Sequence, residues 1–500
     1  MTEFFGAHKK LFLTVWIILL VVSIGLIPLS IFVLRFTEWT AALFMVLSCI
    51  SGAGVFLSLS GKIRRTVIVL ITLIVMCISF IGSFCNPYWD SEVYRLLKGS
   101  LSETESYDKT LTYKQAERDL SYMLGRVKKC HPAFKDGAPE DIQTEYDLAL
   151  ESLKASENIT VNDVKYYAER ILSLQGDGHT SVKAQWDNYR YLSDIPKRNA
   201  EDFILYAING ISLEQLWDEK KALYSYDAES WGVSLMKSDA GNIAGLDYLG
   251  FDTNEITYTW ESPEGERETC TYTAEDFIPY EEYEKIYYQY FEEPASDDFV
   301  SYTIDEENSL AVLTLTQCDY NDIYIDCLNR MFTEIKDKGI QNAAVDLRGN
   351  GGGSSLVADE FIKYLDIDEY EVSAYKQRFG IFTLNSDEGP IQNEKYIDLT
   401  FSGDVYILTD VDTFSSAMLF AQFFKDNNLG TLIGEPPGNN PNGYGDISYF
   451  KLPESGLYLS VSTKKFIRAS GDENDCLVNP DIECDGDNAY DELIKLIQEE

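Results

Sequence analysis

The chain has 500 residues, of which 45% are hydrophobic and 25% are charged, and its formal net charge is −41 at pH 7. This length leaves room for more than one domain, and the composition is that of a globular protein with added apolar segments. The first 100 residues hold eight Lys/Arg and four Asp/Glu, so the remaining 400 hold 33 and 78. Such an acidic chain argues against nucleic acid and anionic lipid surfaces as partners, because phosphate binding depends on Lys and Arg.

Three apolar runs near the N-terminus, residues 11–34, 39–59 and 67–85, contain no charged residue. Each reaches or nearly reaches the ~20 residues that are needed to cross hydrocarbon. A cleaved signal peptide is the alternative for the first run, but its apolar region would be only about 7 to 15 residues long. The sequence therefore predicts three transmembrane helices. They contain no ionisable residue other than cysteine, which argues against a transporter or channel.

Basic residues flank these runs unevenly. They occur at residues 8–10 before the first run and at 62–65 before the third, whereas only Arg35 separates the first from the second. Because cytoplasmic loops are enriched in Lys and Arg, we expect a multi-pass cell-membrane protein with a cytoplasmic N-terminus and an extracytoplasmic chain after residue 85. Three helices exceed what tethering needs, so a membrane-protein partner in the lipid bilayer is a further expectation.

The residues that follow change from a helical to a β-rich pattern. Apolar residues three and four apart predict a helical cap over 107–174. A strand pair with an Asn-Gly turn is expected at 203–211 and a hairpin at 256–272, and the aromatic-acidic stretch 280–293 suggests a surface helix or linker. We therefore divide the chain into a membrane domain (1–88), a helical cap (100–182), a β-rich module (183–300) and an α/β core (301–500).

Short apolar strands alternate with helices in the last part of the chain, which is typical of an α/β core with largely parallel strands. The expected strands are 310–315, 343–347, 405–408, 430–433 and 457–463, and the expected helices are 323–338, 354–365 and 415–426. Catalytic groups in such cores tend to gather where strands end and helices begin.

The most informative segment is DLRGNGGG at residues 346–353, which follows a predicted strand and opens a helix. Glycines there leave N–H groups unshielded beside a helix N-terminus, which is a place to bind an anion. A P-loop would need a following Lys-Ser/Thr, and the glycine spacing does not match a dinucleotide fingerprint. A developing oxyanion fits better, with Gly351 and Gly352 as candidate donors.

Two further segments carry candidate catalytic groups. In TFSSA at 413–417, Thr413 or Ser415 could simply cap the helix, but a serine at this turn would also present its oxygen beside the helix N-terminus. In GDGHT at 176–180, His179 is one of only two histidines after residue 85. A general base near neutral pH is most often His, and the other candidate, His131, stands in a stretch without further signal.

Together with GEPPG at 434–438, these segments resemble the C-terminal processing, or tail-specific, serine peptidases. These enzymes form peptidase family S41, which includes the tricorn-like and retinoid-binding-protein-like branches. The resemblance covers roughly residue 179 to the C-terminus. It implies a ClpP/crotonase-like α/β core in which Ser415 is the nucleophile. The N–H of Ser416 and that of a glycine in the 351–353 turn would form the oxyanion hole.

The resemblance also bears on the base. In the bacterial tail-specific branch the base is a lysine, and the matching position here is Asn440, whose amide cannot accept the serine proton. The tricorn-like branch uses His, Ser and Glu, so His179 is the expected base. An acidic third member is expected within 471–475, with Glu473 as the first candidate.

We therefore expect a membrane-anchored extracytoplasmic serine peptidase that hydrolyses peptide bonds of proteins or peptides by acyl transfer, as an endopeptidase or carboxyl-terminal processing peptidase. No metal or organic cofactor is implied, and the chain lacks G-x-S-x-G and HExxH. The segment 206–212 resembles the Ile-Asn-Gly turn of PDZ modules, which bind peptide C-termini by strand addition. The alternative is an inactive peptidase fold that serves as a peptide-binding receptor or sensor. Cys476 and Cys484 could pair.

Overall fold

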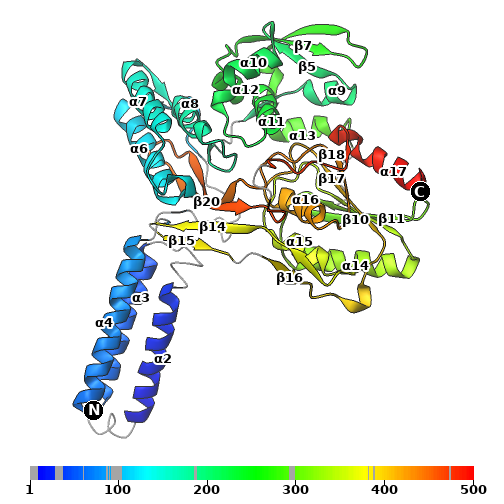
Figure 1. Ribbon diagram of the computed structural model, residues 1–500. Helices are drawn as coiled ribbons and strands as arrows, with labels where there is room; N and C mark the ends of the chain where they lie inside the picture. The colour runs from blue at the N-terminus through cyan, green and yellow to red at the C-terminus, as the bar shows by residue number, and fades with distance from the viewer. Residues whose placement is uncertain are drawn as a thin grey trace.

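A computed structural model of the chain describes residues 9–28, 38–59, 61–85, 88, 91, 104–184, 189–291, 299–380, 382–386, 389–471 and 475–499. Its N-terminal part is a bundle of three helices that projects from the body of the molecule (Figure 1). These helices occupy the three apolar segments: α2 (Lys9–Pro28), α3 (Glu38–Ser58) and α4 (Lys62–Cys85). Within the described ranges, no helix has both the length and the apolarity that a membrane crossing needs. The three predicted transmembrane helices are therefore not confirmed.

The predicted helical cap consists of three helices. Two of them start at capping boxes, in which Thr112 pairs with Gln115 and Thr160 with Asp163, so that the first backbone N–H groups of each helix have acceptors. The helices are α6 (Tyr113–Cys130), α7 (Glu140–Ala155) and α8 (Val161–Leu172), and the short strands β1 (Thr110–Leu111) and β2 (Ile159–Thr160) pair beside them.

The predicted strand pair and hairpin form one antiparallel sheet of the order β6-β5-β7-β8. Its strands are β5 (Ile204–Ile208), β6 (Ile211–Ser212), β7 (Glu255–Glu261) and β8 (Arg267–Thr273). The module is less β-rich than expected, because helices pack on this sheet and bury Trp217, Met236 and Leu246. They are α9 (Ile195–Ala200), α10 (Leu213–Lys220), α11 (Glu229–Ala240) and α12 (Ile243–Leu249). Strand β4 (Arg190–Leu192) pairs with β9 (Phe277–Pro279). Helix α13 (Tyr280–Tyr287) forms the first part of the stretch 280–293, for which a surface helix or linker was expected.

The core is a six-stranded sheet of the order β10-β11-β12-β17-β18-β21, parallel except for β10. Helices cover both faces, which explains why the central strands read as continuous apolar runs. The strands are β10 (Val300–Asp305), β11 (Leu310–Leu315), β12 (Asn342–Asp346), β17 (Asp404–Thr409), β18 (Thr431–Gly434) and β21 (Ile482–Glu483). The helices are α14 (Asp322–Lys338), α15 (Leu356–Ile362), α16 (Ser416–Asp426) and α17 (Ala489–Glu499). This confirms the predicted α/β core.

One predicted strand lies elsewhere. Of the predicted strand 457–463, residues 458–463 belong to β20 (Tyr458–Ile467), which is part of a second, antiparallel sheet and not of the parallel one. An apolar strand pattern cannot tell which sheet a strand joins, because both positions are buried. Strand β20 pairs with β3 (Ser181–Lys183), β14 (Ala374–Phe379) and β19 (Tyr444–Lys451), and β15 (Phe382–Asn385) pairs with the far side of β14. Strand β13 (Glu369–Glu371) pairs separately with β16 (Pro390–Gln392).

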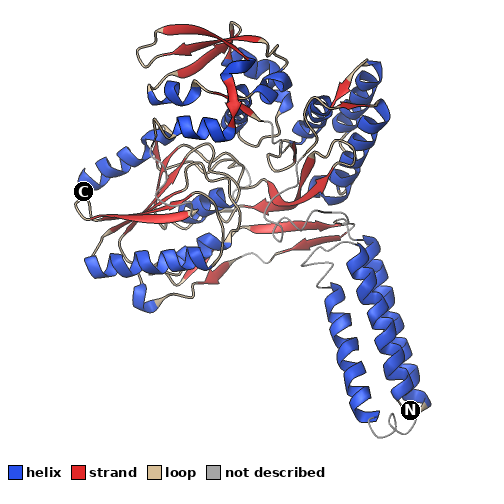
Figure 2. Cartoon of the chain, turned by 180° about the vertical axis from the view of Figure 1, so that it is seen from behind, coloured by secondary structure: helices blue, strands red, loops and turns tan. Residues whose placement is uncertain are grey.

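This second sheet joins the helical cap to the C-terminal part of the chain, as seen from behind in Figure 2. Strand β3 follows the cap directly and pairs with β20, and Ser460 Oγ donates a 2.7 Å hydrogen bond to the carbonyl of His179. Cap residues such as Leu120 share a hydrophobic cluster with Leu459 of β20. The GDGHT segment is therefore fixed against residues that come almost 300 positions later in the chain.

Candidate active site

Ser415 occupies a strained turn at the start of α16. Its backbone has φ 56° and ψ −120°, although it is not a glycine, and its side chain makes no capping hydrogen bond. Backbone strain of this kind costs about 1–3 kcal/mol and persists only where the surroundings enforce it. Here Asn439 Oδ1 accepts a 2.7 Å hydrogen bond from the Ser415 N–H. The hydroxyl of Ser415 is thus not used to cap the helix.

The serine turn and the glycine turn are tied together by their backbones. The Phe414 N–H donates to the Asn350 carbonyl at 2.9 Å, and the Ser416 hydroxyl donates to the Gly353 carbonyl at 2.9 Å. Thr413 does not cap the helix either, because its buried hydroxyl donates to the Leu347 carbonyl at 2.9 Å. The carboxyl ends of β12 and β17 therefore present both turns at one place, as expected for adjacent parallel strands.

Gly352 is the glycine that meets Ser415. A Cβ atom at Gly352 would lie 2.6 Å from Ser415 Cβ and 2.8 Å from Ser416 N, and Gly352 itself has φ 98°. Its N–H already donates to Asn350 Oδ1 at 2.8 Å. The N–H groups of Ser416 and Gly351, in contrast, have no acceptor among the described residues. Of the three predicted oxyanion donors, these two are the ones whose N–H is available.

His179 lies beside the serine turn. Its ring packs on the ring of Phe414, the residue before Ser415, with 4.6 Å between centroids. The side chain is only 7% exposed, and burial lowers the pKa of His179 to about 4, so that the ring is neutral at neutral pH. Neither ring nitrogen has a hydrogen-bond partner among the described residues, the Ser415 hydroxyl included. In unliganded sites such catalytic contacts are often open and tighten when substrate binds.

Asp177 connects the two histidines, and sequence reasoning assigned it no role. Its Oδ2 accepts a 2.9 Å hydrogen bond from His131 Nε2, while its Oδ1 accepts from the His179 N–H at 2.9 Å and lies 3.9 Å from His179 Nδ1. Burial alone would raise the pKa of Asp177, but the hydrogen bond from His131 and, at the low pH where both histidines are protonated, their charges hold it below its usual value. The His131 Nδ1 accepts from the Ala133 N–H, which leaves the proton on Nε2.

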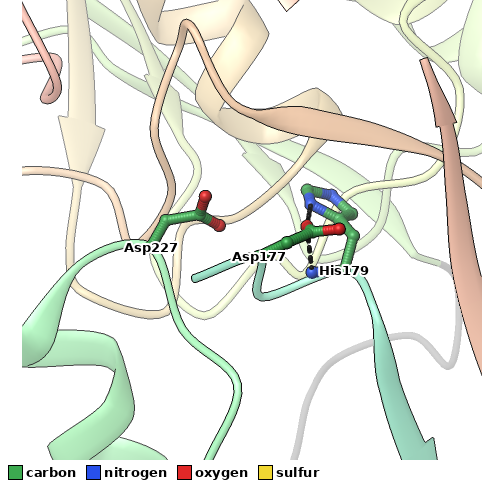
Figure 3. Close-up of side chains that lie close together, drawn as sticks. All are labelled: Asp177, His179 and Asp227. Carbon is green, nitrogen blue, oxygen red and sulfur yellow. Dashed lines mark hydrogen bonds and ion pairs between the residues drawn. The ribbon is translucent and has the colours of Figure 1, made fainter. Parts of the chain in front are cut away.

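The β-rich module also reaches this place. Trp231 of α11 stacks on Phe414 with 4.1 Å between ring centroids, and Asp227, just before α11, accepts a 3.1 Å hydrogen bond from the Gly178 N–H. Burial next to the charge of Asp177 holds the pKa of Asp227 well above its usual value. Asp177, His179 and Asp227 are a group that could hold a metal ion, since their ligand atoms all lie within 4.8 Å of one another (Figure 3). No sequence pattern indicated Trp231 or Asp227.

Two remaining predictions concern residues near the site. Glu473, the expected acidic third member, lies outside the described residues. Asn440, at the position of the lysine base, accepts the Asn442 N–H with its Oδ1 at 2.8 Å and shapes the loop after Asn439. Further away, Cys476 and Cys484 are not joined by a disulfide.

Comparison with known proteins gives a family match and similar solved structures. Residues 309–484 match the family model of peptidase family S41. The crystal structure of mature CPAF superposes with a TM-score of 0.54 at 13% identity and covers 78% of this chain and 98% of its own. A CPAF mutant gives 0.55 at 12% identity, with 77% of this chain and 96% of its own covered. At these identities the structures show a shared fold. Residues 309–484 therefore match peptidase family S41, within a chain whose fold is similar to that of the CPAF structures.

Proposed function

We propose that this protein is a serine peptidase in which Ser415 is the nucleophile. The observation that supports this most is the strained turn of Ser415: its φ is positive, its hydroxyl does not cap the helix, and the bare Gly352 lies against it. A serine that only capped the helix would use its oxygen on the N–H groups of the first turn. A strained, uncapped serine beside free N–H donors is suited to acyl transfer.

The neighbouring groups have the chemistry for the remaining roles. His179 is neutral at neutral pH and would remove the Ser415 proton as the serine attacks a peptide carbonyl, then return it to the leaving amine. The N–H groups of Ser416 and Gly351 would stabilise the oxyanion. Water then hydrolyses the acyl-enzyme. The third acidic member stays a proposal: Glu473 as predicted from the sequence, with Asp177 as the group that positions the His179 backbone.

Covalent labelling would test this assignment. A fluorophosphonate probe should label the wild type but not Ser415→Ala, and His179→Ala should slow labelling by about 100-fold or more, as the loss of general-base catalysis implies. Asp218→Asn, at an exposed aspartate of α10, is the control, and it should label at close to the wild-type rate. No labelling of the wild type, together with no cleavage of a peptide library, would favour the inactive receptor instead.

The substrate class follows from the same proposal. We propose proteins or peptides as substrates. The peptidase would act on them either as an endopeptidase or as a carboxyl-terminal processing enzyme. Digestion of a peptide library with free and amidated C-termini would separate them, because only a carboxyl-terminal processing enzyme should lose activity when the C-terminus is amidated.

We also propose that the three N-terminal helices attach the protein to a lipid bilayer and leave the peptidase domain outside the cytoplasm. They expose apolar side chains to a degree that is unusual for a surface in water, among them Leu11 (60%), Val21 (64%) and Leu43 (55%). Extraction of cell membranes at alkaline pH would test this proposal. Release of the full chain into the soluble fraction would contradict it, and protease shaving of intact cells would report the side on which the domain lies.

A further inference from the structure

Three side chains that could bind a cation meet beside the proposed catalytic centre. The ligand atoms of Asp177, His179 and Asp227 lie within 4.8 Å of one another. Asp177 and His179 come from the turn before β3, whereas Asp227 comes from the loop before α11 and points toward them from the other side (Figure 3). The three side chains therefore come from two segments of the chain, and the first part of the β-rich module lies between these segments in the sequence.

His179 gives an independent reason to expect a ligand here. Its side chain is more than nine-tenths buried, and neither of its ring nitrogens has a hydrogen-bond partner among the described residues. A buried polar atom without a partner costs free energy, which a bound cation would recover. The ring already faces a carboxylate, because Nδ1 lies 3.9 Å from Asp177 Oδ1.

The two carboxylates keep lone pairs for a cation. Asp177 accepts hydrogen bonds from His131 Nε2 and from the His179 N–H, besides a side-chain hydrogen bond with Thr180, and Asp227 Oδ2 accepts from the Gly178 N–H. A carboxylate has about four acceptor positions, so each can also bind a metal. A hydrogen bond from His131 to Asp177 would orient that ligand, as is usual around metal sites. Lys465, whose positive charge acts on Asp227, donates a hydrogen bond to the Asn442 carbonyl.

We propose that Asp177, His179 and Asp227 form an inhibitory site for a divalent cation of the zinc type. One imidazole nitrogen and two carboxylate oxygens suit Zn²⁺, which takes three protein ligands and an open fourth position, whereas Mg²⁺ and Ca²⁺ prefer oxygen ligands alone. Zinc bonds of about 2.0–2.2 Å place ligand atoms roughly 3.4 Å apart, so binding would draw the two segments closer together. The inhibition rests on the proposed function, because it arises when the metal takes the lone pair with which His179 would accept the Ser415 proton.

Metal binding can be measured without peptidase activity. The full-length Ser415→Ala protein is titrated with Zn²⁺ in competition with a chromophoric chelator. We expect one equivalent to bind, with affinity lowered at least about tenfold by Asp227→Asn but not by Asp218→Asn, an exposed aspartate of the same module. Unchanged affinity in Asp227→Asn, or no saturable binding, would overturn the site.

A second measurement covers the case in which the variant does not fold. Co²⁺ added to the folded Ser415→Ala protein should give the intense visible bands of a four-coordinate ion, and Zn²⁺ should remove them. A weak octahedral spectrum, unchanged by Zn²⁺, would contradict the proposed ligand set. Both readouts remain valid if Ser415 turns out not to be a nucleophile.

The inhibitory role is tested on the wild type. Fluorophosphonate labelling of Ser415 should fall at least about tenfold as the site fills with Zn²⁺, and a chelator should restore it. Full labelling at saturating Zn²⁺ would overturn the inhibitory role. If the wild type is never labelled, the proposed function fails, while the titration of Ser415→Ala still decides whether the metal site exists.

Discussion

Gly352 and Ser415 lie so close that no side chain fits between them: a Cβ atom on Gly352 would stand 2.6 Å from Ser415 Cβ. Gly352 also has φ 98°, a backbone conformation that is unfavourable for every residue other than glycine. This contact fixes the glycine turn against Ser415, the proposed nucleophile. It explains why the turn needs a glycine at this position, apart from the N–H donors that the turn is proposed to supply.

Gly352→Ala should therefore lower the peptidase activity by at least about 100-fold, because the serine turn or the proposed oxyanion donors must shift. The strained backbone should also lower the free energy of unfolding by about 1–3 kcal/mol. The labelling rate and chemical denaturation would measure the two effects. Gly125→Ala, inside α6 and with nothing within 4 Å of the added methyl group, is the control. It should leave the labelling rate unchanged and raise the free energy of unfolding by about 0.5–1 kcal/mol, because alanine is the better helix former. Labelling of Gly352→Ala at the wild-type rate would show that close packing of the glycine turn against Ser415 is not required.

Asn439→Ala should slow peptidase activity by about tenfold or more, since the 2.7 Å hydrogen bond from the Ser415 N–H would be lost and the strained turn could relax. Asn439→Asp keeps an acceptor oxygen and should recover most of the rate. The ratio of kcat/KM between the two variants is the measurement. Equal losses in both would mean that the acceptor is not what holds Ser415 in place.

Thr413→Val should lower the free energy of unfolding by about 1–3 kcal/mol, because the buried Leu347 carbonyl and the Asp410 N–H lose their hydrogen bonds to the Thr413 hydroxyl. Urea denaturation would measure the change. Thr333→Val, an exposed threonine of α14 that bonds only to its own helix, is the matched control. A loss no larger than that of the control would argue that these bonds do not tie the turns together.

Glu169 should make the stability of the protein depend on pH. This glutamate is buried, it accepts hydrogen bonds from the Val182 N–H and from Ser225 Oγ (3.1 Å), and burial raises its pKa from 4.5 to about 7, although these bonds and the charges of Lys165 and Lys183 oppose the change. Between pH 4.5 and 7 the folded protein keeps a proton that the unfolded chain loses. The contribution of Glu169 to the free energy of unfolding should therefore fall as pH rises through this window, by about 3 kcal/mol, whereas the lowered pKa of His179 contributes a rise between pH 4 and 6.5.

Glu169→Gln should remove the contribution of Glu169 to the pH dependence, because glutamine does not titrate. Its side-chain oxygen can accept from the Val182 N–H, and its NH2 group can donate to Ser225 Oγ. We expect the variant to be more stable than the wild type at pH 8 and similar to it at pH 4.5, as measured by denaturation at both pH values. Glu151→Gln, an exposed glutamate of α7, should follow the wild type. A stability difference between Glu169→Gln and the wild type that is the same at pH 4.5 and pH 8 would contradict the prediction.

Much of the fold could be predicted because it is recorded locally. The predicted strand 310–315 coincides with β11, and the predicted helix 323–338 differs from α14 by one residue. Buried parallel strands and capped amphipathic helices leave short apolar and polar patterns that can be read in order. The serine and glycine turns were also predictable, since each stands directly after such a strand.

The sequence by itself determined which residues stand at the strand ends, among them Ser415 and Gly352. Only the tertiary structure decided which side chains meet there: His131 reaches Asp177, Asp227 approaches from the module, Trp231 stacks on Phe414, and β20 joins the antiparallel sheet. A pattern along the chain reflects burial and backbone conformation over a few neighbouring residues. Contacts between segments 50 to 300 residues apart depend on how whole elements pack, and no short stretch of sequence contains that information.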